Sequence, residues 1–286
     1  GYVNRDGEAV MGLELLYDDL LRGTPGQLVR ETDRKGIELP DGQMTITPAV
    51  DGKNIRLTID RNIQYYVEAA LNKAYGQWQP KSMIAIAVNP KTMEVLAMAS
   101  LPDFNPNRYW EAESQKSFFN RAIAAQYEPG STFKVVTLAG AIEEGLFDPD
   151  AEFQSGSIAV PGNQVRDHNQ VGWGKITYLE GLLRSSNVAF VKLGYEGLGK
   201  DKLLEYIDRF GFGKKTGIEL SGETPGTVNL LYPSDVARAT FGQGGITVNA
   251  LQLTAAYAAI ANGGMLMKPY VVKEIVDPET GETLQS

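Results

Sequence analysis

The fold is decided by the stretch Tyr127-Glu128-Pro129-Gly130-Ser131-Thr132-Phe133-Lys134. Pro129 and Gly130 are a turn signal, and the apolar residues that follow recur at helical spacing as far as Gly145. We therefore expect a helix over residues 132–144. Because apolar residues lie on both of its faces, the pattern predicts that this helix is buried in the core.

Ser131 and Lys134 lie three residues apart, so a helix places their hydroxyl and amine on one face. The helix N-terminus favours developing negative charge near Ser131. Burial of Lys134 lowers its pKa and lets part of it act as a neutral base, which activates the neighbouring serine as a nucleophile. The alternative is a lysine that extends to solvent, since a Ser-x-x-Lys pattern is expected about once by chance in such a chain.

A second candidate is Ser185-Ser186-Asn187, which lies between two predicted helices over residues 177–185 and 187–193. Ser185 could relay a proton, and the amide of Asn187 could hold a lysine or a substrate amide. Serine and asparagine are also preferred helix caps, so a purely structural role is the alternative.

The rest of the chain predicts an α/β (α+β) fold in which helices pack on a sheet. A strand over residues 55–59 is followed by Asp60 at an N-cap position and a helix over residues 62–78. Residues 83–88 and 95–99 form a hairpin around a turn at 89–92. Later helices are expected at 200–210, 233–240 and 250–262. Residues 1–50, with one short helix over 12–21 and polar alternation over 27–46, are too polar to hold a core of their own.

Composition excludes several classes of function. The 286 residues are 43% hydrophobic and 22% charged, as in ordinary globular proteins. The formal net charge is −8 and no basic stripe is present, so nucleic acid is not an expected partner. The chain has no cysteine and a single histidine, His168, which excludes disulfides, cysteine zinc sites and multi-histidine metal sites. No run of 18 apolar residues and no signal peptide is visible.

The two candidate motifs together resemble the Ser-x-x-Lys and Ser-x-Asn motifs of penicillin-binding proteins and class A β-lactamases. Nearly the whole chain resembles class B penicillin-binding proteins, most of all their cell-division and sporulation-specific branch. The segments that carry this resemblance are Gly12-Leu13-Glu14, Leu21-Arg22-Gly23, Leu57-Thr58-Ile59-Asp60, Val88-Asn89-Pro90-Lys91-Thr92, Phe119-Asn120-Arg121-Ala122, Phe241-Gly242-Gln243-Gly244 and Ala261-Asn262-Gly263-Gly264.

The resemblance implies a penicillin-binding transpeptidase or serine β-lactamase-like fold, with an antiparallel sheet flanked by helices. Residues 1–50 are then expected to be the remnant of a non-catalytic pedestal domain, and residues 51–286 an incomplete transpeptidase domain. Both ends of the chain are expected to be cuts through a longer protein.

The resemblance also implies a role for each candidate residue. Ser131 is the acylated nucleophile, Lys134 the base that takes its proton, and Ser185 the proton shuttle. Asn187 contacts Lys134 and the amide of the bound substrate. The oxyanion hole uses the backbone N–H of Ser131 and one N–H from a sheet-edge strand. No metal or organic cofactor is implied.

The implied enzyme is a serine D,D-transpeptidase that cross-links peptidoglycan stem peptides ending in D-Ala-D-Ala and is acylated by β-lactams. It is expected on the extracytoplasmic face of a bacterial membrane, anchored by an N-terminal helix outside this chain. A membrane glycosyltransferase and divisome or sporulation proteins are the implied partners. The alternatives are a β-lactamase, which the pedestal segment argues against, a β-lactam sensor, and a non-catalytic divisome scaffold.

Two further features need separate interpretations. Lys215-Thr216-Gly217 precedes the Asn262-Gly263-Gly264 segment and lies in a glycine-rich turn, so we expect a loop there with no catalytic role. The catalytic Lys-Thr-Gly strand is expected beyond Ser286, which predicts that the fragment is poorly active or inactive.

His168 could suggest a Ser-His-Asp triad, but no Gly-x-Ser-x-Gly elbow accompanies it. We therefore expect a histidine in a polar loop.

Overall fold

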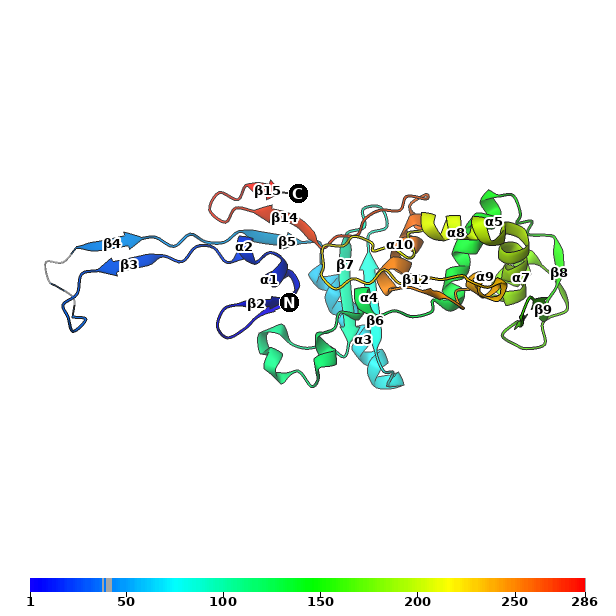
Figure 1. Ribbon diagram of the computed structural model, residues 1–286, viewed down its shortest axis with the longest axis horizontal. Coiled ribbons are helices and arrows are strands. Elements are labelled where there is room, and N and C mark those ends of the chain that lie inside the picture. Colours follow the sequence, from blue (N-terminus) through cyan, green and yellow to red (C-terminus); the bar gives the residue numbers. More distant parts are fainter. Residues whose placement is uncertain (38, 40–42, 286) are drawn as a thin grey trace.

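Asp60 separates a strand from a long helix, as the sequence predicted. In this computed structural model, which describes residues 1–37, 39 and 43–285, strand β5 spans Asn54–Leu57 and helix α3 spans Arg61–Trp78 (Figure 1). The Asp60 carboxylate accepts hydrogen bonds from the backbone N–H groups of Asn62 and Ile63, at 2.8 and 3.0 Å. The side chain thus satisfies two N–H groups that have no partner within the helix.

The predicted hairpin consists of β6 (Met83–Val88) and β7 (Val95–Leu101), paired antiparallel. Helix α3 packs against β7. Strand β14 (Val272–Val276) pairs antiparallel with β5 on one side and with β15 (Thr283–Gln285) on the other. Within the described residues, every pairing of two strands is antiparallel. The expected combination of antiparallel sheets and flanking helices is therefore confirmed.

Three short antiparallel strand pairs lie among the later helices. They are β8 (Glu152–Gln154) with β11 (Lys175–Thr177), β9 (Ser157–Val160) with β10 (Asn163–Arg166), and β12 (Thr227–Val228) with β13 (Ile246–Thr247). The first two pairs cover the stretch of residues 150–175 that is rich in glycine and asparagine.

The helices that follow β7 agree with the predicted ranges to within about two residues at most ends, except that the three short helices before residue 125 were not predicted. They are η1 (Pro106–Glu111), η2 (Gln115–Phe118), α4 (Arg121–Ala124), η3 (Gly130–Phe133), α5 (Lys134–Glu143), α6 (Tyr178–Leu183), α7 (Asn187–Val191), η4 (Lys192–Leu198), α8 (Gly199–Arg209), α9 (Pro233–Ala239) and α10 (Ala250–Ala261). Of these elements, η4 continues α7 as a wider, π-type helix.

The main core forms around α5. Phe133 and Val136 are fully buried and pack with Tyr206 and Ile207 of α8 and with residues of α9 and α10. The prediction that this helix is buried on all sides is wrong, because Ile142 is 56% exposed. Its first turn also has 3₁₀ geometry, as η3, before α5 begins. Lys134 follows the buried Phe133 and is itself buried, which places a charged group in the core.

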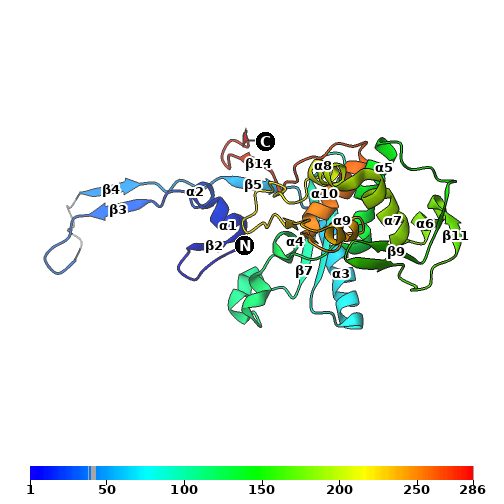
Figure 2. The same ribbon diagram turned by 45° about the vertical axis from the view of Figure 1, so that its right-hand side comes forward.

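The described part of residues 1–50 forms an extended appendage (Figures 1 and 2). It contains β1 (Tyr2–Val3), β2 (Ala9–Met11), α1 (Gly12–Leu16), α2 (Asp18–Leu21), β3 (Gln27–Arg30) and β4 (Met44–Thr47). Helices α1 and α2 replace the single helix predicted over residues 12–21, because the backbone of Tyr17 leaves helical geometry at φ −113° and ψ 24°.

The antiparallel pair β3 and β4 projects away from the rest of the chain (Figure 2). All eight residues of these two strands are exposed. Among the described residues, none before Thr58 is buried, as expected for a segment without its own core. The division into a pedestal remnant and a transpeptidase domain stays a prediction.

We expect Asp60→Ala to lower the free energy of unfolding by about 1 kcal/mol, because it removes the side-chain cap of α3. Urea unfolding of the variant and the wild type would measure the difference. Lys73→Ala, at an exposed position of the same helix, should change the free energy by less than about 0.5 kcal/mol. Equal effects of the two substitutions would contradict the capping role.

Candidate active site

Ser131 lies in the first turn of η3, and its side chain is exposed. The preceding Gly130 has a φ of +58°, and its N–H donates to the carbonyl of Gly242 at 3.0 Å. A Cβ atom at Gly242 would lie 2.3 Å from the carbonyl oxygen of Gly130. Only glycine therefore allows the turn after α9 to pack this closely against the turn that carries the serine.

Lys134 begins α5 and is 4% exposed. Its Nζ donates to the carbonyl oxygen of Ser185 at 2.7 Å, to Asn187 Oδ1 at 2.9 Å, and meets Ser185 Oγ at 3.0 Å. The ring of Phe190 lies 5.2 Å from Nζ, within range of a cation–π interaction. We call Lys134, Ser185 and Asn187 the lysine cluster. The structure thus brings three of the four predicted site residues into contact and excludes the alternative of a solvent-exposed lysine.

The fourth residue, Ser131, is adjacent by helical spacing but not bonded to the cluster. Within the described residues, no hydrogen bond joins its hydroxyl to Lys134 Nζ in this resting arrangement. Catalytic hydrogen bonds are often long in the absence of substrate and shorten when it binds. The exposed Ser131 hydroxyl is therefore open to a ligand, and its approach to the amine is expected when substrate binds.

The turn between α6 and α7 serves two purposes at once. Ser186 Oγ accepts from the N–H of Ala189 at 3.1 Å, so Ser186 is the helix cap that the sequence offered as the alternative. Ser185, one residue earlier, has a φ of +54°, a conformation that costs of the order of 1 kcal/mol or more for a residue with a side chain. That backbone turns both its carbonyl and its hydroxyl toward Lys134.

The amide of Asn187 is fixed in orientation. Its Nδ2 donates to the carbonyl of Arg166 at 2.9 Å, which leaves Oδ1 to accept from Lys134. An amide that is anchored through its nitrogen presents only its oxygen to the lysine.

Burial lowers the pKa of Lys134 from 10.5 to about 8, and the negative charge of Asp167 acts in the opposite direction. The loss of hydration of the ammonium is therefore the larger effect. With a pKa of about 8, a substantial fraction of the amine is neutral near physiological pH. This is the condition that a lysine must meet to act as a general base.

The partners of Lys134 define a direction for proton transfer. Two of them are carbonyl oxygens, which can only accept hydrogen bonds, so a neutral amine can place its two N–H groups on them. The remaining lone pair can then accept a proton from a hydroxyl. Ser185 Oγ, at 3.0 Å, is the hydroxyl already in contact, and it can pass a proton in either direction.

Asp167 is the residue of this site that the sequence analysis missed. Its side chain is fully buried and accepts three hydrogen bonds, two of them from residues that flank Asn187. No local signal distinguishes it, because it lies in a polar loop. The neighbouring His168 is exposed in a turn, with its ring 5.4 Å from that of Trp173. The prediction of a loop histidine is thus confirmed.

The Lys215-Thr216-Gly217 segment is an irregular loop, as predicted. The Thr216 hydroxyl donates to Glu223 Oε1 at 2.6 Å, and the N–H groups of Thr216 and Gly217 also donate to this carboxylate. Glu223 is 6% exposed. These bonds give the segment a structural function, because they satisfy a buried carboxylate.

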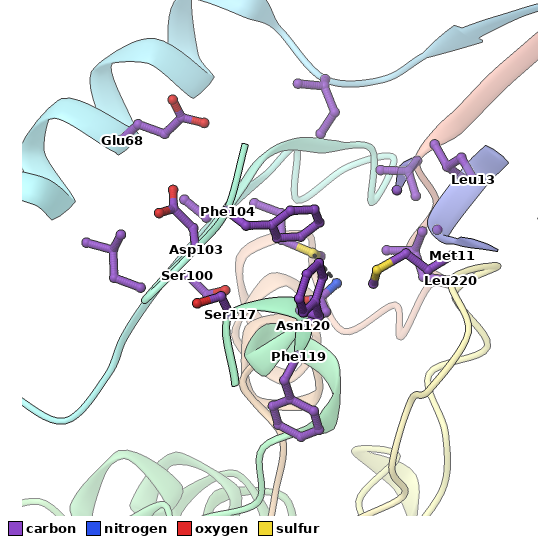
Figure 3. Close-up of a pocket in the computed structure, with 18 of the residues that line it drawn as sticks. Met11, Leu13, Glu68, Ser100, Asp103, Phe104, Ser117, Phe119, Asn120 and Leu220 are labelled. Carbon is purple, nitrogen blue, oxygen red and sulfur yellow. Dashed lines mark hydrogen bonds between the residues drawn. The ribbon is translucent and has the colours of Figure 1, made fainter. Parts of the chain in front are cut away.

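A cavity of about 390 Å³ lies elsewhere, between the start of the chain, α3 and β7. Met11 and Leu13 face Ser100 and Asp103 across it (Figure 3). Neither Ser131 nor any member of the lysine cluster lines this cavity.

In the part of the chain that the structure describes, no group of three or more acidic or histidine side chains is arranged to hold a metal ion. No helix there is long and apolar enough to cross a membrane.

Comparison with known proteins gives a consistent result. The model of the penicillin binding protein transpeptidase domain matches residues 83–286. Stage V sporulation protein D of Bacillus subtilis is 42% identical over 290 residues, which cover all of this chain and 45% of that protein. The peptidoglycan D,D-transpeptidase FtsI of Escherichia coli is 33% identical over 288 residues, which cover 99% of this chain and 47% of FtsI. The chain spans about half the length of these curated relatives.

Solved structures show the same likeness. Penicillin binding protein 3 of Mycobacterium tuberculosis, complexed with ampicillin, superimposes with a TM-score of 0.86 at 32% identity. The match covers all of this chain and 60% of that one.

The pKa of Lys134 makes a prediction for stability. Folding lowers this pKa from 10.5 to about 8, so between these values the unfolded chain binds more protons than the folded chain. Stability due to Lys134 therefore rises with pH across this window, by up to about 3 kcal/mol. We expect the free energy of unfolding of the wild type to rise relative to that of Lys134→Met. Urea unfolding of both proteins across the window would measure this, and parallel pH profiles would contradict it.

Proposed function

Because the chain belongs to the penicillin-binding protein transpeptidase family, we propose that it carries the catalytic site of a serine D,D-transpeptidase. The substrates are peptidoglycan stem peptides that end in D-Ala-D-Ala, and β-lactams acylate the same serine. One observation supports this proposal most strongly. A buried lysine with a lowered pKa lies one helical turn after an exposed serine and is bound by Ser185 and Asn187.

In the acylation step, Ser131 Oγ attacks the carbonyl carbon of the penultimate D-Ala. Lys134 Nζ takes the hydroxyl proton as the new C–O bond forms. The backbone N–H of Ser131, in the first turn of η3, and a second N–H from a neighbouring strand stabilise the oxyanion. The C–N bond then breaks, and the terminal D-Ala leaves as an amine after receiving the proton from Lys134 by way of Ser185.

Asn187 has two tasks in this scheme. Its Oδ1 accepts from Lys134 and one N–H of its Nδ2 donates to the Arg166 carbonyl, so the second N–H can donate to the backbone of the stem peptide. The backbone N–H groups of Thr216 and Gly217 already donate to the carboxylate of Glu223. This supports another strand as the source of the second N–H of the oxyanion hole.

The second half-reaction resolves the acyl-enzyme. The amine of a neighbouring stem peptide attacks the ester carbonyl and loses a proton to Ser185 and Lys134, and Ser131 regains its proton as the C–O bond breaks. In a β-lactam the amide that breaks is part of a ring, so the leaving nitrogen stays attached to the acyl group. It then obstructs the incoming amine, and the acyl-enzyme persists.

The cellular setting of this reaction is also a proposal. The names of the two curated relatives connect them with sporulation and with peptidoglycan. We propose that the protein acts on the outer face of the bacterial membrane, anchored by a helix outside this chain. A membrane glycosyltransferase that supplies glycan strands, with division or sporulation proteins, would be its partner.

We expect Ser131→Ala to abolish the slow covalent labelling by benzylpenicillin that is predicted for this chain, because the variant lacks the attacking oxygen. Intact-mass spectrometry would follow the gain of one drug mass. Ser114→Ala, at an exposed hydroxyl of another loop, should label like the wild type. Labelling of Ser131→Ala would refute the proposal. A stable adduct on the wild type, without turnover of a D-Ala-D-Ala peptide, would favour the alternative of a β-lactam sensor.

Ser185→Ala should slow acylation by about a hundredfold or more, because it removes the hydroxyl that exchanges protons with Lys134. Stopped-time labelling with a fluorescent penicillin would give the rate. Leu183→Ala, at a 79% exposed position of the same turn region, is the control and should retain the wild-type rate. An unchanged rate for Ser185→Ala would exclude the shuttle role.

A further inference from the structure

We propose that Asp167 is a positioning residue for this reaction, which anchors the turn carrying the lysine cluster and holds a fixed negative charge beside it. This inference rests on the proposed function. It concerns a residue that touches neither Ser131 nor Lys134 through a hydrogen bond.

The Asp167 carboxylate joins two separate segments of the chain. Its Oδ1 accepts from Ser186 Oγ at 2.8 Å and from the N–H of Val188 at 3.1 Å. Its Oδ2 accepts from the N–H of Gly156 at 2.8 Å, and its own N–H donates to the Gly156 carbonyl at 2.9 Å. The side chain is fully buried, so these bonds are protected from competition by water.

These contacts surround Asn187. Ser186 and Val188 are its neighbours in sequence, and both are held by Asp167. The Asn187 amide itself donates to the carbonyl of Arg166, the residue before Asp167. Two adjacent residues, at the end of β10 and just after it, thus fix three adjacent residues at the start of α7. This arrangement holds Asn187 Oδ1 in place and maintains Ser185 at its φ of +54°.

Asp167 also acts on Lys134 through its negative charge. Its three donors are a hydroxyl and two backbone N–H groups, all of them neutral. None of these donors carries a positive charge that would cancel the charge of the carboxylate. The field of that charge acts on Lys134 and raises its pKa against the larger effect of burial. A base whose pKa fell much further would hold the proton of Ser131 poorly.

Asp167 is the charged group whose field opposes burial at Lys134 within the described residues. The guanidinium of Arg166 donates to Gln164, and His168 is exposed against Trp173. Glu128 accepts from the N–H of Gly244. Several basic side chains on α6, η4, α8 and the loop after α8 are paired with acidic groups. These pairs are Arg184 with Glu180, Lys192 with Glu196, Lys202 with Glu144, Arg209 with Glu143, and Lys214 with Asp208.

The test compares Asp167→Asn, Asp167→Glu and the wild type. Asparagine can still accept from Ser186 and Val188 through its oxygen, but it lacks the charge and cannot accept from Gly156 through its nitrogen. The first measurement is an NMR pH titration of ¹³Cε-labelled lysine in the full chain, with the Lys134 signal assigned from Lys134→Arg. This readout does not depend on acylation.

We expect the titration midpoint of Lys134 to fall by about one pH unit in Asp167→Asn, as for the loss of an opposite charge. In Asp167→Glu the midpoint should stay within about 0.3 units of the wild type, because the charge is retained. An unchanged midpoint in Asp167→Asn would overturn the electrostatic part of the proposal, whatever happens to the rate. The titration can be read even if no acylation is observed. Failure of the positioning role of Asp167 is therefore distinguishable from failure of the proposed transpeptidase function.

The second measurement is the rate of acylation by benzylpenicillin against pH. In Asp167→Asn the maximal acylation rate should be lower by about tenfold or more, and the midpoint of the rate–pH profile should shift to lower pH. Ser186→Ala keeps the charge and removes one anchor, so its plateau should fall while its midpoint stays. If Asp167→Asn does not fold, Ser186→Ala still tests the anchoring role. A wild-type plateau in that variant would overturn it.

Discussion

The hydrogen bonds from Lys134 to Ser185 and Asn187 are the interaction on which the rest of this site depends. They hold a cation at the start of a core helix, where hydration is lost and the pKa falls to about 8. Isolated charges are rarely buried because the loss of hydration is costly. Here two carbonyl oxygens and a hydroxyl replace part of the water shell, and Asp167 supplies an opposing charge.

The fold provides the rigidity that this arrangement needs. Helix α5 begins at Lys134, three residues after Ser131, and is fixed by a core of aromatic and aliphatic side chains from α8, α9 and α10. The turn between α6 and α7 contacts it through the bond between Ser185 and Lys134, and the strand pairs around residues 150–175 support that turn through Asp167. The base Lys134 and the groups that hold it come from α5, from the turn between α6 and α7, and from the region of Asp167. Their distances can stay within a fraction of an ångström only if each of these segments is firmly packed.

The sequence predicted the parts of this structure that depend on local pattern. The Asp60 cap, the hairpin of β6 and β7, and the spacing of Ser131 and Lys134 each follow from residues close together in the chain. Asp167 could not be predicted, because its role arises from contacts with residues about twenty positions away. Likewise, the non-helical backbone at Tyr17 and the exposure of Ile142 depend on packing that no periodicity reveals.

The central claim is that Ser131 is the nucleophile activated by Lys134, and peptide mapping of the penicillin adduct tests it most directly. Trypsin would release Ser131 in the peptide of residues 122–134, and Ser185 and Ser186 in the peptide of residues 185–192. The account predicts that the penicilloyl group is found on Ser131 in the first peptide. An adduct on the second peptide, or on any other serine, would contradict it.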